Sequence, residues 1–229
     1  VNVVGSSVSR EADSIAYTWA GPEISVASTK AYSVQVAMMY LLATHFALVR
    51  GSIDEKTAKE IIQTLSEIPS IIEKMLTDTS EVQHVAAEFQ NAHSAFYIGR
   101  GLDYTLSLEG SLKLKEISYI HSESYAAGEL KHGTISLIEE GTPVVALASQ
   151  ERLFEKMLSN VKEVKARGAS VFMLCKEGLT PGDAADFVLP LPALPDLFMP
   201  LLEVAPLQLF AYYMSVLRGC DVDKPRNLA

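Results

Sequence analysis

The sequence predicts an α/β fold in which a parallel sheet is covered by helices on both faces, as in flavodoxin-like and Rossmann-like proteins. The prediction rests on the second half of the chain, where short apolar segments alternate with longer segments of helical pattern. These apolar segments are AFYIG, TPVVALAS, ASVFMLC and DFVLPLP. Short buried strands that alternate with helices are typical of parallel sheets, because each parallel connection needs a crossover.

The composition indicates a globular chain that can bury a sizeable core. Of its 229 residues, 48% are hydrophobic and 21% are charged, which is enough for one large domain or two small ones. The net charge of −9 argues against nucleic acid as a partner, because phosphate backbones are bound by clustered Lys and Arg. Cys175 and Cys220 lack metal-ligand spacing and are expected to be reduced thiols of a cytoplasmic protein.

The longest apolar run is VQVAMMYLLATHFALV, residues 34–49. It is too short to span a bilayer comfortably, so we expect a buried helix and no membrane partner. Ser28 or Thr29 is placed to cap this helix, which should end near Arg50 before Gly51. The other elements expected in the first half are strands at 1–4 and 23–26 and helices at 54–65, 70–76 and 81–92, with the IPS motif at 68–70 as an interruption.

The second half is expected to contain three further helices, at residues 103–119, 152–167 and 197–219. The last is largely apolar and carries Pro200 and Pro206 near its start. Gly99 and Gly101 flank Arg100 between a strand and a helix. Such a site offers helix N–H groups to an anion at the carboxyl end of a strand. A tight turn that needs glycine for its backbone alone explains the motif equally well.

The segment LEGSLKLKEISYIHSESYAAGELKHG, residues 108–133, places charged residues inside an apolar helical run. Glu109, Lys113 and Glu116 fall within about 60° of one another on a helix, whereas Lys115 points elsewhere. One interpretation is a set of salt bridges on a solvated face. The other is a proton-transfer site in which a carboxylate lies next to a lysine and near His132. Periodicity leaves both open.

Four motifs resemble one family. EGSLKLKEISYIHSESYAAGELKHG, EISVASTKAY, APLQLFAYY and DVDKPRNLA are similar to the isomerase half of the glutamine–fructose-6-phosphate amidotransferases, or glucosamine-6-phosphate synthases. The resemblance covers the whole chain and implies the sugar isomerase (SIS) type of three-layer α/β fold. It implies the end of a first SIS domain at 1–56, a helical connector at 57–88, a second SIS domain at 89–219, and the start of a C-terminal tail at 220–229.

The resemblance also implies catalytic roles. The glutamate that matches Glu116 shuttles a proton between C1 and C2 of the sugar. The lysine that matches Lys113 lies beside it. The histidine that matches His132 helps to open the fructose ring and is contributed across a dimer interface.

Substrate contacts are implied for Val26, Ala27 and Ser28, in the VASTK match, and Arg226 is implied to order the site from the DKPRNLA tail. The implied reaction converts fructose 6-phosphate and glutamine into glucosamine 6-phosphate and glutamate, with no metal or other cofactor. The implied partners are the sugar phosphate, a second copy of the chain in a homodimer, and a glutaminase domain in the full-length protein.

The chain also departs from the family pattern. The Ser/Thr-rich phosphate loop has no counterpart, and the sequence stops at Ala229, before the lysine that forms a Schiff base with the sugar in this family. We therefore expect a fragment that is inactive alone. Two alternatives remain: an SIS module that senses sugar phosphates in a regulator, and a relative that deglycates or deaminates sugar phosphates. The ELKHG and DVDKPRNLA motifs favour the synthase.

Overall fold

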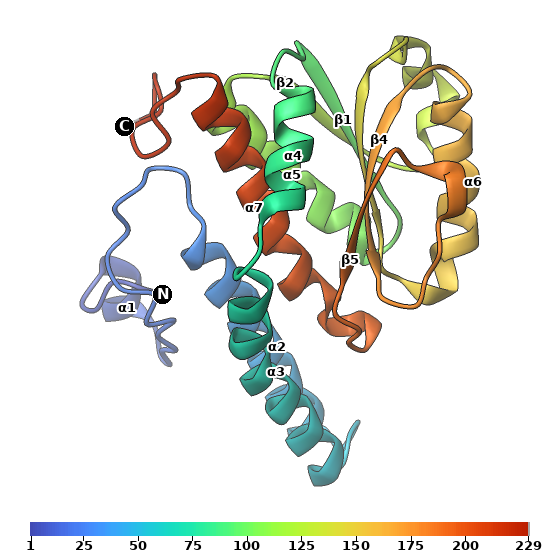
Figure 1. The fold of residues 1–229 in the computed structure, drawn as a ribbon. Coiled ribbons are helices and arrows are strands. Elements are labelled where there is room, and N and C mark those ends of the chain that lie inside the picture. Colours follow the sequence, from blue (N-terminus) through green and yellow to red (C-terminus); the bar gives the residue numbers. More distant parts are fainter. Residues whose placement is uncertain (229) are drawn as a thin grey trace.

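A five-stranded, fully parallel sheet forms the centre of the computed structural model, which describes residues 1–228 (Figure 1). The strands lie in the order β2-β1-β3-β4-β5, which confirms the predicted parallel sheet. The order reverses direction between β1 and β3, and ligands of such sheets bind outside the carboxyl ends of the strands at this point. The strands are Ser94–Gly99 (β1), His121–Ala126 (β2), Pro143–Ala148 (β3), Ser170–Lys176 (β4) and Phe187–Leu191 (β5).

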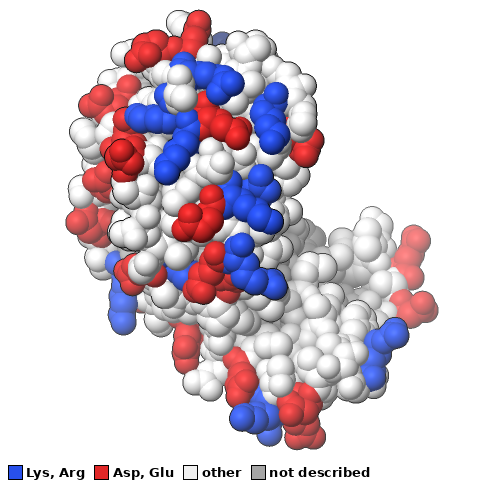
Figure 2. Space-filling view, turned by 90° about the vertical axis from the view of Figure 1, so that its right-hand side faces the viewer, with Lys and Arg blue, Asp and Glu red and all other residues white. Residues whose placement is uncertain are grey.

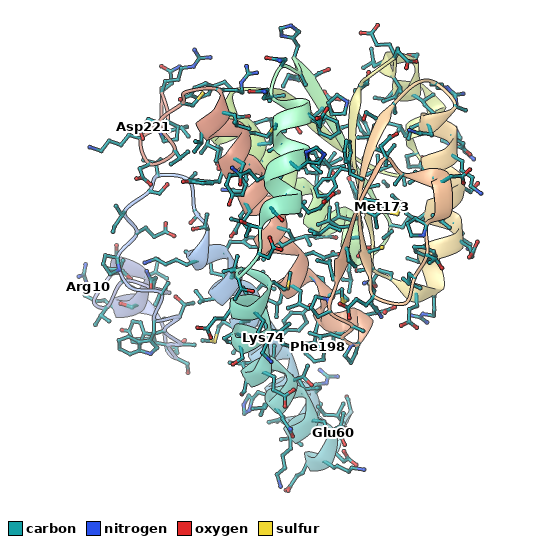
Figure 3. The ribbon with its side chains drawn as sticks, viewed as in Figure 1. Arg10, Glu60, Lys74, Met173, Phe198 and Asp221 are labelled. Atoms are coloured by element: carbon teal, nitrogen blue, oxygen red, sulfur yellow. The ribbon has the colours of Figure 1, made fainter. Side chains whose placement is uncertain are left out.

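Helices cover both faces of the sheet, as predicted (Figure 1). One layer consists of Ser80–Phe89 (α4), Leu102–Ser118 (α5) and Met199–Leu217 (α7), and the other contains Phe154–Lys165 (α6). Alternate strand residues enter two separate cores. Tyr97 packs with α5 and α7. Ile98 packs on the side of α6, as does Met173, which is labelled in Figure 3. This alternation is what the pleat of a strand imposes.

The edge strand β2 was not expected, because its sequence HSESYA is polar. Its serines are satisfied by the neighbouring helix. The hydroxyl of Ser122 lies 2.8 Å from that of Ser111 on α5, and the hydroxyl of Ser124 lies 2.6 Å from that of Ser107. Because these hydrogen bonds satisfy the polar side chains, the strand does not need an apolar sequence. A search for apolar segments therefore does not find it.

The connections contain short elements. These are the helix Ser7–Glu11 (α1) and the 3-10 turns Leu130–His132 (η1), Thr134–Leu137 (η2), Glu151–Leu153 (η3), Gly182–Ala184 (η4) and Asp196–Phe198 (η5). Phe198, labelled in Figure 3, marks the point where the chain enters α7.

The first half of the chain corrects three predictions. Residues 1–4 and 23–26 form no strands, and the side chain of Val3 is 66% exposed. The chain between Glu55 and Met75 is one helix (α3) that continues through Pro69, where an interruption was expected. Ile68 is buried and its apolar neighbours pack against the same core, so one packed face stabilises the helix despite the backbone hydrogen bond that proline cannot donate. Asp54 caps this helix as predicted, accepting from the amide of Thr57 at 2.8 Å.

The helix Lys30–Val49 (α2) lies against α3 in an antiparallel pair that projects away from the sheet (Figure 1). The expectation that it is buried is wrong, since Ala31 and Thr44 are its buried residues. Two helices, Lys30–Val49 and Asp196–Leu217, are long and apolar enough to cross a membrane. Of the apolar segment in Asp196–Leu217, 61% is buried in the molecule, whereas only 6% of the apolar segment in Lys30–Val49 is buried. Met39, Phe46 and Val49 are 60%, 58% and 71% exposed.

Candidate functional site

Three charged side chains of α5 form a cluster in which the lysine is buried and the two glutamates are partly buried. The ammonium of Lys113 donates to a carboxylate oxygen of Glu116 at 2.5 Å, and an oxygen of Glu109 lies 3.6 Å away. The side chain of Lys113 is only 5% exposed, whereas Lys115 lies on the exposed face of the helix. The predicted common face is therefore confirmed. The salt bridges of the other interpretation are present, but Lys113 is buried instead of lying on a solvated face.

Burial sets the electrostatics of this cluster. Burial raises the pKa of Glu109, the Lys113 ammonium lowers it, and the Glu116 carboxylate raises it further. One oxygen of Glu109 is buried without a hydrogen bond among the described residues. On α2, burial and then the Glu109 carboxylate raise the pKa of Tyr32. An ammonium shared by two carboxylates in a poorly hydrated place can stabilise a developing negative oxygen, and a carboxylate there can accept a proton.

A pocket of about 180 Å³ opens above Lys113. Four segments distant in sequence form its walls: α5, α7, the stretch before α2 and the stretch after α7. The lining residues are Ser25, Ala27, Thr29, Lys113, Ile117, Gln208, Tyr212, Val222 and Asp223. Two of the residues predicted for the site, Ala27 and Lys113, thus line one cavity. Gln208 and Tyr212 were missed, because they lie on the long apolar helix α7 and no local pattern separates them from core positions.

Hydrogen bonds fasten the stretch before α2 to the C-terminal segment. The amide of Val26 donates to the carbonyl of Asp223 at 3.1 Å, and the hydroxyl of Ser25 donates to the carbonyl of Val222 at 3.3 Å. In Figure 3, Asp221 marks this segment. Ala27 is buried, while Val26 is 40% exposed. The Ser28 hydroxyl lies 2.9 and 3.0 Å from the carboxylate oxygens of Glu23, so it points to an acidic side chain in this structure.

Arg226 is held at the end of α5. Its guanidinium carbon lies 4.1 Å from the centre of the Tyr119 ring, and its amide donates to the Tyr119 hydroxyl at 2.9 Å. Tyr119 ends the helix in a left-handed conformation with φ of 62°. Arg226 thus joins the tail to the helix of Lys113 and Glu116, but it is not among the residues that line the pocket.

His132 lies at the opposite end of the sheet from Glu116. Glu116 is in the last turn of α5, which leads to the amino end of β2, whereas His132 follows the carboxyl end of that strand. A strand of six residues spans about 20 Å. His132 is exposed, so one chain does not bring it beside Glu116.

The Gly99–Gly101 motif lies at the carboxyl end of β1, as predicted. A Cβ on Gly99 would lie 2.5–2.7 Å from backbone atoms of Asp103 and Tyr104, and Gly101 has φ of +59°. The turn interpretation, which requires a positive φ, explains Gly101, whereas Gly99 is required because the backbone of α5 packs closely on the end of β1. Donors at the end of the neighbouring strand β3 are already occupied: the Asp103 carboxylate accepts from the Ser149 amide and hydroxyl, both at 2.8 Å, and from the Gln150 amide at 3.4 Å.

Two further acidic residues, Asp103 at the start of α5 and Glu203 on α7, are buried. Burial raises the pKa of Asp103 to about 6, against the lowering effect of the Ser149 and Gln150 hydrogen bonds. Glu203 on α7 is fully buried, and neither of its carboxyl oxygens has a hydrogen-bond partner among the described residues. Burial, followed by the Asp103 charge, raises the pKa of Glu203 well above its usual value. Sequence reasoning missed this pair, although Asp103 follows a glycine turn at the start of a helix.

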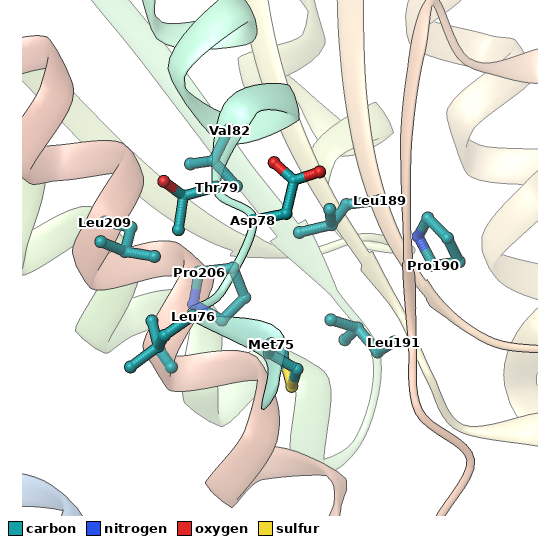
Figure 4. Close-up of a pocket in the computed structure, with 11 residues that line it drawn as sticks. Met75, Leu76, Asp78, Thr79, Val82, Leu189, Pro190, Leu191, Pro206 and Leu209 are labelled. Carbon is teal, nitrogen blue, oxygen red and sulfur yellow. The ribbon is translucent and has the colours of Figure 1, made fainter. Parts of the chain in front are cut away.

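Another pocket, of about 130 Å³, lies between the α3–α4 junction, β5 and α7 (Figure 4). Its lining is apolar apart from Asp78 and Thr79, and includes Leu76, Leu189 and Leu209. It lacks the cationic side chains that a phosphate would need. On the face that carries α6, Lys and Arg alternate with Asp and Glu instead of forming a basic stripe (Figure 2).

Comparisons with known proteins identify the family to which the chain is similar. A model of the SIS domain matches residues 88–218. Glutamine–fructose-6-phosphate aminotransferases [isomerizing] of Caldanaerobacter subterraneus subsp. tengcongensis and Clostridium tetani are 58% and 55% identical to the chain over its whole length. The chain spans 38% of the length of each. These matches confirm the resemblance drawn from the motifs.

Solved structures show the same fold. The C-terminal domain of glucosamine-fructose-6-phosphate aminotransferase from Francisella tularensis has a TM-score of 0.92 and 36% identity, and the match covers 97% of this chain and 63% of that one. Glucosamine-6-phosphate deaminase from Thermotoga maritima has a TM-score of 0.69 at 21% identity, over 97% of this chain and 62% of that one, a likeness of fold alone. The chain therefore belongs to the SIS domain family.

Proposed function

We propose that the chain provides the sugar-isomerising part of an enzyme that makes glucosamine 6-phosphate and glutamate from fructose 6-phosphate and glutamine. The observation that carries this proposal is the buried Lys113 between Glu109 and Glu116, at the wall of the pocket that Ala27 also lines. The similarity to the isomerising aminotransferases along the whole chain supports it.

Ketose–aldose isomerisation moves one proton between neighbouring carbons. In the proposed sequence, ammonia released from glutamine first condenses with the C2 carbonyl of the open-chain sugar, and water leaves to give an imine. The Glu116 carboxylate then takes the proton from C1, the electron pair forms a C1–C2 double bond, and the nitrogen takes up a proton to give an enaminol. Glu116 returns its proton to C2 while the C1 hydroxyl loses its proton and becomes the aldehyde carbonyl. The Lys113 ammonium stabilises the negative charge that develops on the sugar oxygen. The residues Val26, Ala27 and Ser28 would contact the sugar, and Arg226 would order the tail beside them.

We propose that a second copy of the chain completes the site. Its pocket of about 180 Å³ is smaller than the roughly 300–1,000 Å³ of ordinary small-molecule sites. We infer a homodimer in which His132, exposed and far from Glu116 in its own chain, enters the neighbour's site and assists ring opening. The exposed apolar side chains of α2 support such an association. The proposed chemistry uses proton transfer by side chains and requires no cofactor. We further expect a glutaminase domain in the full-length protein and a cytoplasmic location.

The alternatives gain no specific support. The similarity to the deaminase is a similarity of fold. On the face that carries α6, positive and negative side chains alternate, so this face has no basic stripe that could bind nucleic acid, as a DNA-binding regulator would need (Figure 2). A regulatory sensor would also have no need for a carboxylate beside a buried ammonium.

The test is Glu116→Gln in the full-length protein. Glutamine keeps the shape of the side chain and its hydrogen bonds but accepts no proton, and a positioned base contributes about 10²–10⁴-fold in rate. We expect exchange of the C1 hydrogen of the sugar with deuterated solvent to fall by that factor, while glutamine hydrolysis continues. Glu155→Gln, at an exposed glutamate of α6, is the matched control. Near-normal exchange in Glu116→Gln, with an unchanged melting temperature, would leave Glu116 a structural residue.

A further inference from the structure

Arg100, in the turn after β1, is tied to the opposite helix layer. Its Nε and Nη2 atoms donate to the side-chain oxygen of Asn160 on α6, at 2.9 and 2.8 Å. Asn160 is 5% exposed and Arg100 is partly buried. Two N–H groups that meet one fixed oxygen set the plane of the guanidinium as well as its position. Neither residue takes part in the proposed chemistry.

The guanidinium lies against the loop that leaves β2. A Cβ on Gly128 would be 2.7 Å from Nη2 of Arg100, so a glycine allows the loop to lie this close. The same loop is fastened to the strand below, because the amide of Ala127 donates to the carbonyl of Gly99 at 2.9 Å. The turn after β1 therefore supports the loop through both a backbone bond and a side-chain contact.

The loop leads within a few residues to His132. The amide of Glu129 donates to the carbonyl of Ala126 at 2.8 Å, and the amide of His132 donates to the carbonyl of Glu129 at 3.0 Å. Leu130 is buried in the core on the side of α6, and His132 is exposed. The backbone around His132 is thus fixed while its imidazole faces outward.

We propose that Arg100 and Asn160 are positioning residues, which hold the loop 127–133 so that His132 is presented in one orientation to the neighbouring subunit. This inference rests on the proposed function, in which His132 assists ring opening across a dimer interface. Its physical basis is that misplacing a reacting group by about 1 Å can cost about 100-fold in rate. Without this support the loop would be mobile, and the imidazole of His132 would occupy many positions.

The experiment compares Asn160→Leu with Asn160→Asp in the full-length protein. Leucine has a similar size but accepts no hydrogen bond, whereas aspartate keeps an acceptor for the guanidinium. For Asn160→Leu we expect amide hydrogen exchange in residues 127–133 to rise about tenfold or more and kcat for glucosamine 6-phosphate formation to fall about 10–100-fold, with glutamine hydrolysis unchanged. Asn160→Asp should restore both. If Asn160→Leu does not fold, Arg100→Lys replaces it in the experiment, because lysine keeps the positive charge but loses the pair of N–H groups that bind the Asn160 oxygen.

A double variant separates positioning from a general structural effect. Added to His132→Ala, Asn160→Leu should cause no further loss of kcat, because its effect passes through the imidazole. A loss that multiplies in the double variant would overturn the inference. The inference would also be overturned if His132→Ala is inactive but Asn160→Leu changes neither the amide exchange of the loop nor kcat. That outcome would not affect the proposed function. Full activity in His132→Ala would instead overturn the role of His132 in the proposed function and the presentation inferred here.

Discussion

The ammonium of Lys113 lies 2.5 Å from a carboxylate oxygen of Glu116, three residues further along the same helix. Ion pairs at this spacing on a solvated helix contribute little, because water screens both charges. This pair differs because the Lys113 side chain is 5% exposed and a second carboxylate, that of Glu109, completes the cluster. Removing one member of a buried ion pair leaves the others poorly solvated and uncompensated.

Lys113→Met should therefore destabilise the protein by about 3–5 kcal/mol at neutral pH. Without the ammonium, the pKa of Glu109, which burial already raises, should rise further, so the loss should shrink as the pH falls and the carboxyl protonates. Urea unfolding at several pH values measures this. Lys115→Met, at an exposed lysine two residues away, should change stability by less than about 0.5 kcal/mol. Equal stability of the two variants would show that the cluster is solvated.

Asp103→Asn should change how stability depends on pH. Burial raises the pKa of Asp103 from an ordinary 3.8 to about 6, so the folded state binds a proton more tightly than the unfolded state. Stability from this group is therefore present below about pH 4 and is lost as the pH rises through about 6, a change of about 3 kcal/mol. The amide in Asp103→Asn does not titrate and should remove that slope.

Chemical denaturation of the wild type and Asp103→Asn between pH 4 and 7 measures the difference. As the pH falls, the free energy of unfolding of the wild type should increase relative to that of Asp103→Asn. Asp183→Asn, at an exposed aspartate, should run parallel to wild type. If Asp103→Asn also runs parallel, Asp103 titrates like an exposed group.

Gly99→Ala should destabilise the fold by about 1–3 kcal/mol or more. The new methyl group would lie 2.5–2.7 Å from backbone atoms at the start of α5, and backbone cannot move aside as a flexible side chain can. Thermal unfolding gives the result. Ser94→Ala, at the first residue of the same strand, should stay within about 0.5 kcal/mol of wild type. A comparably small loss for Gly99→Ala would mean that α5 shifts easily against β1.

The chain should form homodimers at concentrations of tens of micromolar, where obligate interfaces are roughly saturated. Light scattering measures the mass. Phe46→Glu places a charge among exposed apolar residues of α2, at a side chain that is 58% exposed, and should weaken association. Gln63→Glu, on an exposed position of α3, adds the same charge and should have no effect. A wild-type chain that stays monomeric would exclude the arrangement proposed for His132.

The sequence by itself determined the strands β1, β3, β4 and β5, most of the helices, and the common face of Glu109, Lys113 and Glu116. These features depend on neighbours along the chain: a buried strand needs a short apolar run, and residues three or four apart share a helix face. The family resemblance was equally readable, because its motifs are contiguous segments of sequence.

Only the tertiary structure decided the rest, because it depends on contacts between distant residues. Whether the polar segment 121–126 becomes a strand depends on β1 and on the α5 serines it meets. Whether α2 is buried depends on what covers it, and its apolar sequence was misleading for that reason. The pocket at Lys113 and the Asp103 contacts with Ser149 likewise join segments far apart in the chain. Periodicity records which face of an element is apolar, but not which partner that face will meet.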